Sequence, residues 1–172
     1  MPRLRYQVAA SLDGFIAGPD GEYDWIPEDP SIDMEALYEQ FGTLVMGRKT
    51  YQTLESAGHA EMPGKHVVVF SRTLAPESYP QLEIVSENQL ERISALKQSE
   101  DKDIWLFGGG ALFTYLADAG LVDTVEIAVV PVLLGSGLQL APRLANRVGL
   151  TLTRHVVYPS GIVLLEYDVA RA

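Results

Sequence analysis

Continuous apolar runs alternate along the chain with segments in which apolar residues recur at helical spacing. The runs predict buried β-strands at 4–10, 43–46, 66–71, 82–85, 103–107 and 122–132. The helical spacing predicts helices over 32–41, with Ser31 as the N-cap, and over 48–54, 88–98 and 111–119. Two further β runs, 150–157 and 162–169, flank Pro159-Ser160-Gly161, and this pattern predicts a hairpin or a tight reversal.

Buried strands that alternate with helices are typical of a mainly parallel sheet with both faces covered. The C-terminal pair of β runs predicts an antiparallel edge on that sheet. A chain of 172 residues is about the size of one domain. The sequence therefore predicts a single α/β domain over residues 1–172, built as a three-layer sandwich.

Composition and charge exclude several classes of function. With 13 Lys and Arg against 23 Asp and Glu, the net charge of −10 argues against a nucleic-acid binder and against docking on anionic lipid. The absence of cysteine excludes disulfides and thiol nucleophiles, and three scattered histidines predict no metal site. No apolar run reaches the roughly 20 residues of a membrane span. We therefore expect a cytoplasmic protein. If it binds a phosphate, its few Lys and Arg residues must be clustered at that site.

The end of the strand at 43–46 places Gly47, Arg48, Lys49 and Thr50 at the start of a helix. Helix N-termini favour negative charge, so two cations there are electrostatically misplaced. A bound phosphate would resolve that conflict, since free N–H groups and cations would then share one anion. The alternative is that Arg48 and Lys49 point into water.

Two more strand ends carry groups that suit a phosphate. Gly108, Gly109 and Gly110 open a predicted helix, which makes sense where backbone approaches a ligand or takes a positive φ, although a plain tight turn is the alternative. Ser71 and Arg72 end a third strand. A Rossmann dehydrogenase is disfavoured, because Phe113 stands where the dinucleotide fingerprint needs a small residue.

Five short motifs follow one another at the predicted strand ends: ASLDGFIA at 10–17, VMGRKTY at 45–51, VFSR at 69–72, LFGGG at 106–110 and VPVLLGSG at 130–137. In this order they resemble the dihydrofolate-reductase-like superfamily. Within it, they resemble the branch that includes the reductase domain of bacterial riboflavin biosynthesis, here as a stand-alone member. The resemblance implies an NADPH-dependent reductase with that fold, and a homodimer.

The resemblance also implies roles for particular residues. Ala10 and Ile16 would lie near the nicotinamide. Around the 2′-phosphate and the neighbouring phosphates would lie Gly47, Arg48, Lys49, Thr50, Ser71 and Arg72. The pyrophosphate would meet Gly108, Gly109, Gly110, Ala111 and Leu112 at the start of the helix predicted over 111–119.

The substrate side is less specified. Asp13 is the first candidate for a catalytic or substrate-binding group, with an Asp-Gly turn as the alternative reading. Asp33, followed by Glu35, is the candidate for a proton-handling carboxylate, with a surface acid as the alternative. The expected substrate is a small pterin- or aminopyrimidine-like molecule. A non-catalytic nucleotide-binding module that keeps only the cofactor half is the other hypothesis.

Overall fold

The computed structural model describes residues 1–170. Its β-strands are β1 (Leu4–Ser11), β2 (Phe15–Ala17), β3 (Phe41–Gly47), β4 (His66–Phe70), β5 (Glu83–Val85), β6 (Asp103–Gly108), β7 (Thr124–Val130), β8 (Leu138–Gln139), β9 (Leu150–Val157) and β10 (Val163–Val169). Its helices are α1 (Met34–Glu39), α2 (Arg48–Ser56), α3 (Gln89–Ser99) and α4 (Gly110–Asp118), with a short 3₁₀ turn, η1 (Pro76–Ser78).

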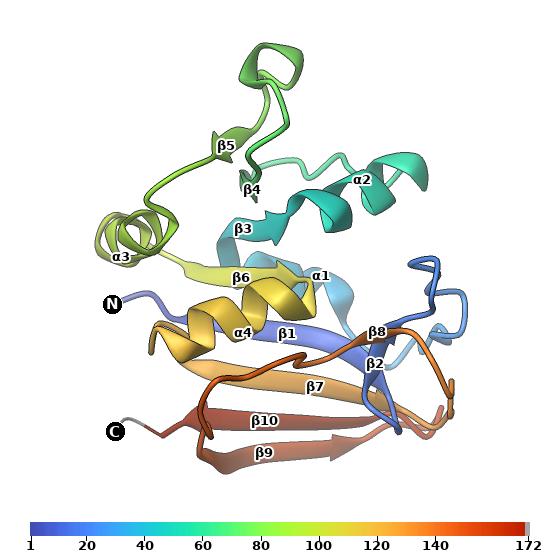
Figure 1. Ribbon diagram of the computed structural model, residues 1–172. Coiled ribbons are helices and arrows are strands. Elements are labelled where there is room, and N and C mark those ends of the chain that lie inside the picture. Colours follow the sequence, from blue (N-terminus) through green and yellow to red (C-terminus); the bar gives the residue numbers. More distant parts are fainter. Residues whose placement is uncertain (171–172) are drawn as a thin grey trace.

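Eight strands form one sheet in the order β5-β4-β3-β6-β1-β7-β10-β9 (Figure 1). The pairs from β5 through to β7 are parallel, whereas β10 runs antiparallel to both β7 and β9. The predicted parallel sheet with an antiparallel C-terminal edge is therefore confirmed. β2 and β8 form a second, two-stranded antiparallel sheet, which the hydrophobic pattern does not reveal.

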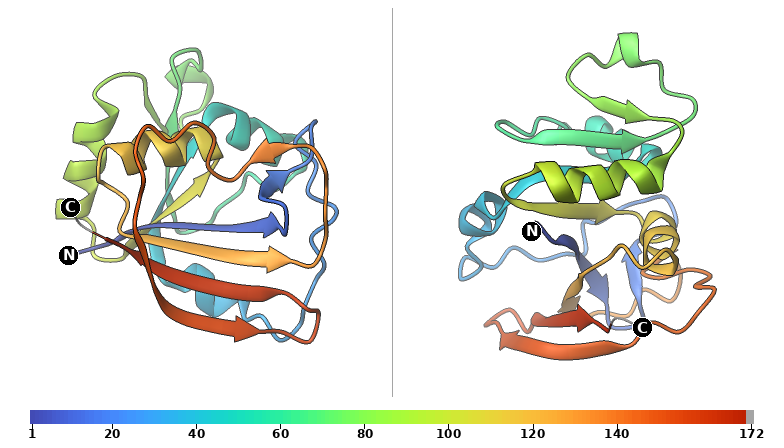
Figure 2. Two further views of the ribbon diagram at one scale, coloured as in Figure 1. Left: turned by 60° about the horizontal axis from the view of Figure 1, so that its bottom comes forward. Right: turned by 90° about the vertical axis from the view of Figure 1, so that its left-hand side faces the viewer.

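Helices lie on both faces of the large sheet, which confirms the three-layer arrangement (Figure 2). On one face, Ile93 of α3 and Leu116 of α4 are fully buried against Leu106 of β6. On the other face, Tyr51 of α2 packs with Trp105 of β6 and with residues of β3 and β4. Successive side chains of a strand point to opposite faces, so β3, β4 and β6 are apolar on both.

The strands beyond β6 differ, because their second face lacks a complete apolar cover. In β1, Leu4 and Tyr6 are fully buried on the α3–α4 side, while Arg5, Gln7 and Ala9 alternate with them and face the opposite way. β7 repeats the pattern, with Val125 in the core and Glu126 on the opposite face. The polar and small positions of β1 and β7 thus form an open floor beside α1.

The N-terminal boundary of α1 differs from the prediction. Asp33, not Ser31, is the N-cap: its Oδ1 accepts a hydrogen bond from the Ala36 N–H at 2.9 Å. Ser31 instead donates its hydroxyl to Asp29, in the loop before the helix. Both residue types are good caps, so the local pattern did not distinguish them. In residues 1–170, the structure contains no helix that is long and apolar enough to cross a membrane.

Candidate functional site

A cavity of about 2030 Å³ opens at the carboxyl ends of the central strands and extends over the floor of β1 and β7. Its wall includes the first turns of α1, α2 and α4, together with parts of β9 and β10. In open α/β sheets this is the edge at which ligands bind, because helix N-termini converge there. The cavity brings together most of the residues that the sequence singled out.

Two of the helices that reach the cavity start with a glycine N-cap, Gly47 for α2 and Gly109 for α4. Within the described chain, neither helix has a side-chain cap or an acid in its first turn. Both glycines have an ordinary negative φ, so the backbone conformation does not require glycine. A Cβ at Gly47 would meet no described atom within 4 Å, and one at Gly109 would approach only Thr50 and Ile16. Both positions therefore leave free space where backbone N–H groups face the cavity.

Arg48, Lys49 and Thr50 all line the cavity from the first turn of α2. Arg48 donates to Gln52 one turn further on, at 3.1 Å, and the structure gives it no carboxylate partner among residues 1–170. This leaves positive charge at a helix N-terminus, the arrangement that favours a bound anion.

The three consecutive glycines differ in whether a positive φ or close packing requires glycine. Gly108 has a φ of +131°, and its peptide bond to Gly109 is cis. Gly110 is demanded by packing, because a Cβ there would lie 2.2 Å from the Gln139 carbonyl oxygen. Gly109 has neither constraint and faces the cavity, together with Ala111 and Leu112. Of the predicted pyrophosphate segment, the backbone at Gly109 is thus the part most free to meet a ligand.

Some of the predicted cofactor residues lie beside the cavity without lining its described wall. Ala10 is buried in β1. Ser71 and Arg72 follow β4, next to Gly47, which pairs with Phe70. The Ser71 hydroxyl oxygen accepts from the Thr73 and Leu74 N–H groups, so its visible contacts serve the turn, and Arg72 is exposed.

Asp13 connects two loops at the edge of the site. Its carboxylate accepts from the Ser11 hydroxyl at 2.6 Å and from the backbone N–H groups of Leu134 and Gly135 at 3.0 and 2.7 Å. The Ser11 hydrogen bond, followed by the two backbone bonds, lowers the pKa of Asp13 to about 2. These contacts favour a role in holding the loops in register, and Asp13 is outside the described wall of the cavity.

Asp33 does line the cavity, at the start of α1. Its Oδ1 caps the helix, which fixes the carboxylate near the floor of β1 and leaves the carboxylate further acceptor capacity. Glu35 is exposed and is not part of the described wall. Between the two acids, the geometry thus selects Asp33 as the one that faces a ligand.

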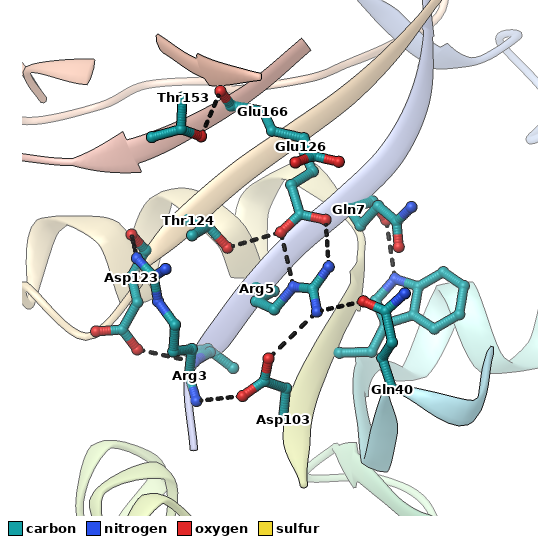
Figure 3. A network of polar contacts seen from close by, with 12 residues as sticks. Arg3, Arg5, Gln7, Gln40, Asp103, Asp123, Thr124, Glu126, Thr153 and Glu166 are labelled. Carbon is teal, nitrogen blue, oxygen red and sulfur yellow. Dashed lines mark hydrogen bonds and ion pairs between the residues drawn. The ribbon is translucent and has the colours of Figure 1, made fainter. Parts of the chain in front are cut away.

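The floor carries a polar network that the sequence analysis missed (Figure 3). Arg5 donates to both carboxylate oxygens of Glu126, at 2.7 and 2.8 Å, and also to Gln40 and Asp103. Burial alone would lower the pKa of Arg5, but the hydrogen bonds and charges of Glu126 and Asp103 outweigh it and raise that pKa. The available signal was polar residues alternating with apolar ones in the first strand, but the carboxylate that pairs with Arg5, Glu126, is 121 residues away in the sequence.

Comparison with known proteins agrees with this architecture. The family model of the RibD C-terminal domain matches residues 2–164. The protein YyaP of Bacillus subtilis (strain 168), whose function is uncharacterised, is 33% identical over 177 aligned positions, which cover 96% of this chain and 94% of YyaP. The chain therefore belongs to the RibD C-terminal domain family.

Solved structures extend the comparison. A protein attributed to riboflavin biosynthesis in Shewanella sp. PV-4 superposes with a TM-score of 0.86 and 27% identity, over 99% of this chain and 100% of that one. Dihydrofolate reductase from Enterococcus faecalis, solved with NADP(H), superposes with a TM-score of 0.62 and 20% identity, over 97% and 94% of the two chains. The fold is thus dihydrofolate-reductase-like, and family and fold together support a reductase-type role.

Proposed function

We propose that this protein is an NADPH-dependent reductase that transfers a hydride to a small pterin- or aminopyrimidine-like molecule. The observation that carries the proposal is the pair of glycine N-caps, Gly47 and Gly109. Neither has a side chain to cap its helix, and both line one cavity together with Arg48 and Lys49. This is a site for an extended polyanion with two phosphate-bearing parts. The E. faecalis dihydrofolate reductase, which shares the fold, was solved with NADP(H).

In this proposal the chain's own groups hold the cofactor through charge and backbone N–H groups. Arg48, Lys49 and Thr50 would surround the 2′-phosphate, and the N-terminus of α4 would receive the pyrophosphate. Ile16, which lies near the position of a Cβ on Gly109, would border the nicotinamide. When bound, the reduced nicotinamide supplies the hydride.

The reduction also consumes a proton, and Asp33 is the group that we assign to deliver it. Addition of the hydride to a C=N or C=O carbon pushes the bond electrons onto the heteroatom, which then takes a proton. Asp33, which lines the cavity, would pass a proton to that heteroatom, directly or through a water molecule. The apolar residues around the cavity, including Trp105 and Phe107, exclude water from the reacting atoms.

The test is oxidation of NADPH, followed by the absorbance of the reduced nicotinamide, with 5,6-diaminouracil, a dihydropterin and their oxidised counterparts as substrates. The proposal predicts consumption of NADPH that depends on both the enzyme and the added heterocycle. Binding of NADPH with no turnover on any of these compounds would favour the non-catalytic module instead.

A further inference from the structure

Unlike the other polar groups named on the cavity floor, the side-chain carboxamide of Gln7 has a buried oxygen, Oε1, with no hydrogen-bond partner in the described structure. Gln7 lines the cavity from the middle of β1, and its backbone carbonyl oxygen accepts from the Trp105 indole N–H at 2.9 Å. A polar atom that has lost water without gaining a partner destabilises the folded chain.

The neighbours of Gln7 show that this floor otherwise satisfies its polar groups. The Arg5 guanidinium is paired bidentately with Glu126, and the Thr124 hydroxyl donates to the same carboxylate at 3.0 Å (Figure 3). Since buried polar groups are normally paired, the open acceptor on Gln7 calls for a partner from outside the chain. An N–H donor on a ligand is the complementary group.

The charges along this part of the wall indicate what kind of ligand fits. Arg5 is neutralised by Glu126, and Arg154 of β9 is paired with Glu166 at 2.8 Å. The unpaired cations of the described wall, Arg48 and Lys49, lie at the other end, on α2. The floor around Gln7 thus offers no free positive charge for a phosphate on the substrate.

Apolar residues lie on the cavity floor and wall beside Gln7. Ala9 and Ala128, which pair across β1 and β7, add only methyl groups to the floor, and Trp105 and Phe107 of β6 complete the wall. Such a surface suits a planar ring, with one polar side chain fixing its orientation.

We propose that Gln7 determines substrate specificity: its carboxamide accepts from a ring N–H, and the substrate is an uncharged planar heterocycle that carries no phosphate. The carboxamide Nε2 would donate to a carbonyl next to that N–H, so that a lactam edge is read by two parallel hydrogen bonds. This inference rests on the proposed function, since it assigns the other half of the same cavity.

The test measures ligand affinity by calorimetry on protein saturated with NADPH. The probes are 5,6-diaminouracil, its N1,N3-dimethyl derivative, in which both ring N–H donors are blocked, and the 5′-phosphate of its 6-ribosylamino derivative. Wild-type protein should bind the free base at least about tenfold more tightly than the dimethyl compound, because the dimethyl compound has no ring N–H to pair with the Gln7 acceptor. The phosphorylated compound should gain no affinity over the free base.

Gln7→Met is the decisive variant, with Gln98→Met, at an exposed position on α3, as its matched control. Gln7→Met should lose about tenfold or more in affinity for the free base while its NADPH affinity stays unchanged. In the absence of ligand its Tm should rise, by roughly 2–4 °C, because an unpaired buried acceptor is removed. A merely structural glutamine would instead give a lower Tm and unchanged affinity.

Three results would overturn the assignment while the cofactor proposal stands. They are equal binding of the free base by wild type and Gln7→Met, tighter binding of the phosphorylated compound, and no binding of any probe to the NADPH-saturated wild type. Failure of wild-type protein to bind NADPH is a separate outcome. It contradicts the proposed function, and this inference falls with it.

Discussion

The two ends of the cavity are built in different ways. At the cofactor end, each group comes from a single strand–turn–helix junction, such as Gly47 to Thr50 between β3 and α2. At the substrate end, the groups come from alternate positions of strands that are far apart in sequence, as when Arg5 of β1 meets Glu126 of β7. In the proposed function, the first end would bind an anion through charge and backbone N–H groups. The second end pairs its own charges and, in the described structure, leaves the buried carboxamide oxygen of Gln7 without a hydrogen bond.

The largest expected effect is that of Gly109→Val on NADPH affinity. Together with Gly110→Ala, it tests whether Gly109 is needed for ligand binding and Gly110 for packing. Gly109→Val should weaken NADPH binding by at least about a hundredfold, because the valine side chain would occupy the space between Thr50 and Ile16. The fold should persist, since φ at Gly109 is −84°. Isothermal calorimetry together with a thermal melt measures both effects.

Gly110→Ala is the contrasting variant. Its Cβ would lie 2.2 Å from the Gln139 carbonyl oxygen, so the free energy of unfolding should fall by about 1–3 kcal/mol and Tm should drop. If Gly109→Val lost stability and kept its NADPH affinity, the assignment of Gly109 to ligand binding and Gly110 to packing would be wrong.

Asp33→Asn tests the acid that faces the substrate end. Asparagine caps a helix about as well as aspartate, so α1 and Tm should be kept. Turnover should fall by about a hundredfold or more, because the amide cannot deliver a proton, while NADPH affinity is unchanged. Steady-state kinetics with the best substrate of the heterocycle panel provides the measurement.

Glu35→Gln is the matched control for Asp33→Asn, since Glu35 is an exposed acid on the same helix. Its turnover should equal that of wild type. An equal loss in both variants would remove the distinction between the two acids.

Arg48→Ala tests the charge at the cofactor end. NADPH affinity should fall by about tenfold to a hundredfold, the value of a charge-assisted hydrogen bond, whereas NADH affinity should change little. Arg147→Ala, at an exposed position away from the described wall, should leave both affinities unchanged. Equal losses for NADPH and NADH in Arg48→Ala would show that Arg48 does not contact the 2′-phosphate.

The smallest effect concerns the two loops that Asp13 connects at the edge of the site. Because the folded-state pKa of Asp13, about 2, lies below its ordinary value of 3.8, ionised Asp13 contributes stability above pH 4 that is lost as pH falls toward 2. Asp13→Asn should therefore have a slightly lower Tm than wild type at neutral pH. The difference should shrink between about pH 4 and pH 2, and a difference independent of pH would argue against the contacts of Asp13 with Leu134 and Gly135.

The contrast between groups from one strand–turn–helix junction and groups from strands distant in sequence also explains what the sequence could predict. The parallel sheet, the helices and the Gly47–Thr50 junction are encoded by neighbouring residues, so local patterns were sufficient to predict them. The pairing of Arg5 with Glu126 depends on which residues tertiary folding brings together. Asp33 and Ser31 are both good local caps, so the pattern could not choose between them. Gly110 shows the same limit: only the approach of the Gln139 carbonyl oxygen reveals that packing requires glycine there.

The most direct test is a paired titration of wild-type protein with NADPH and NADH, followed by tryptophan fluorescence, because Trp105, one of the two tryptophans, lines the cavity. The account predicts saturable NADPH binding at least about tenfold tighter than NADH binding, because only NADPH carries the phosphate that Arg48, Lys49 and Thr50 would hold. Equal affinities would contradict the 2′-phosphate site, and the absence of binding by either nucleotide would contradict the cofactor site as a whole.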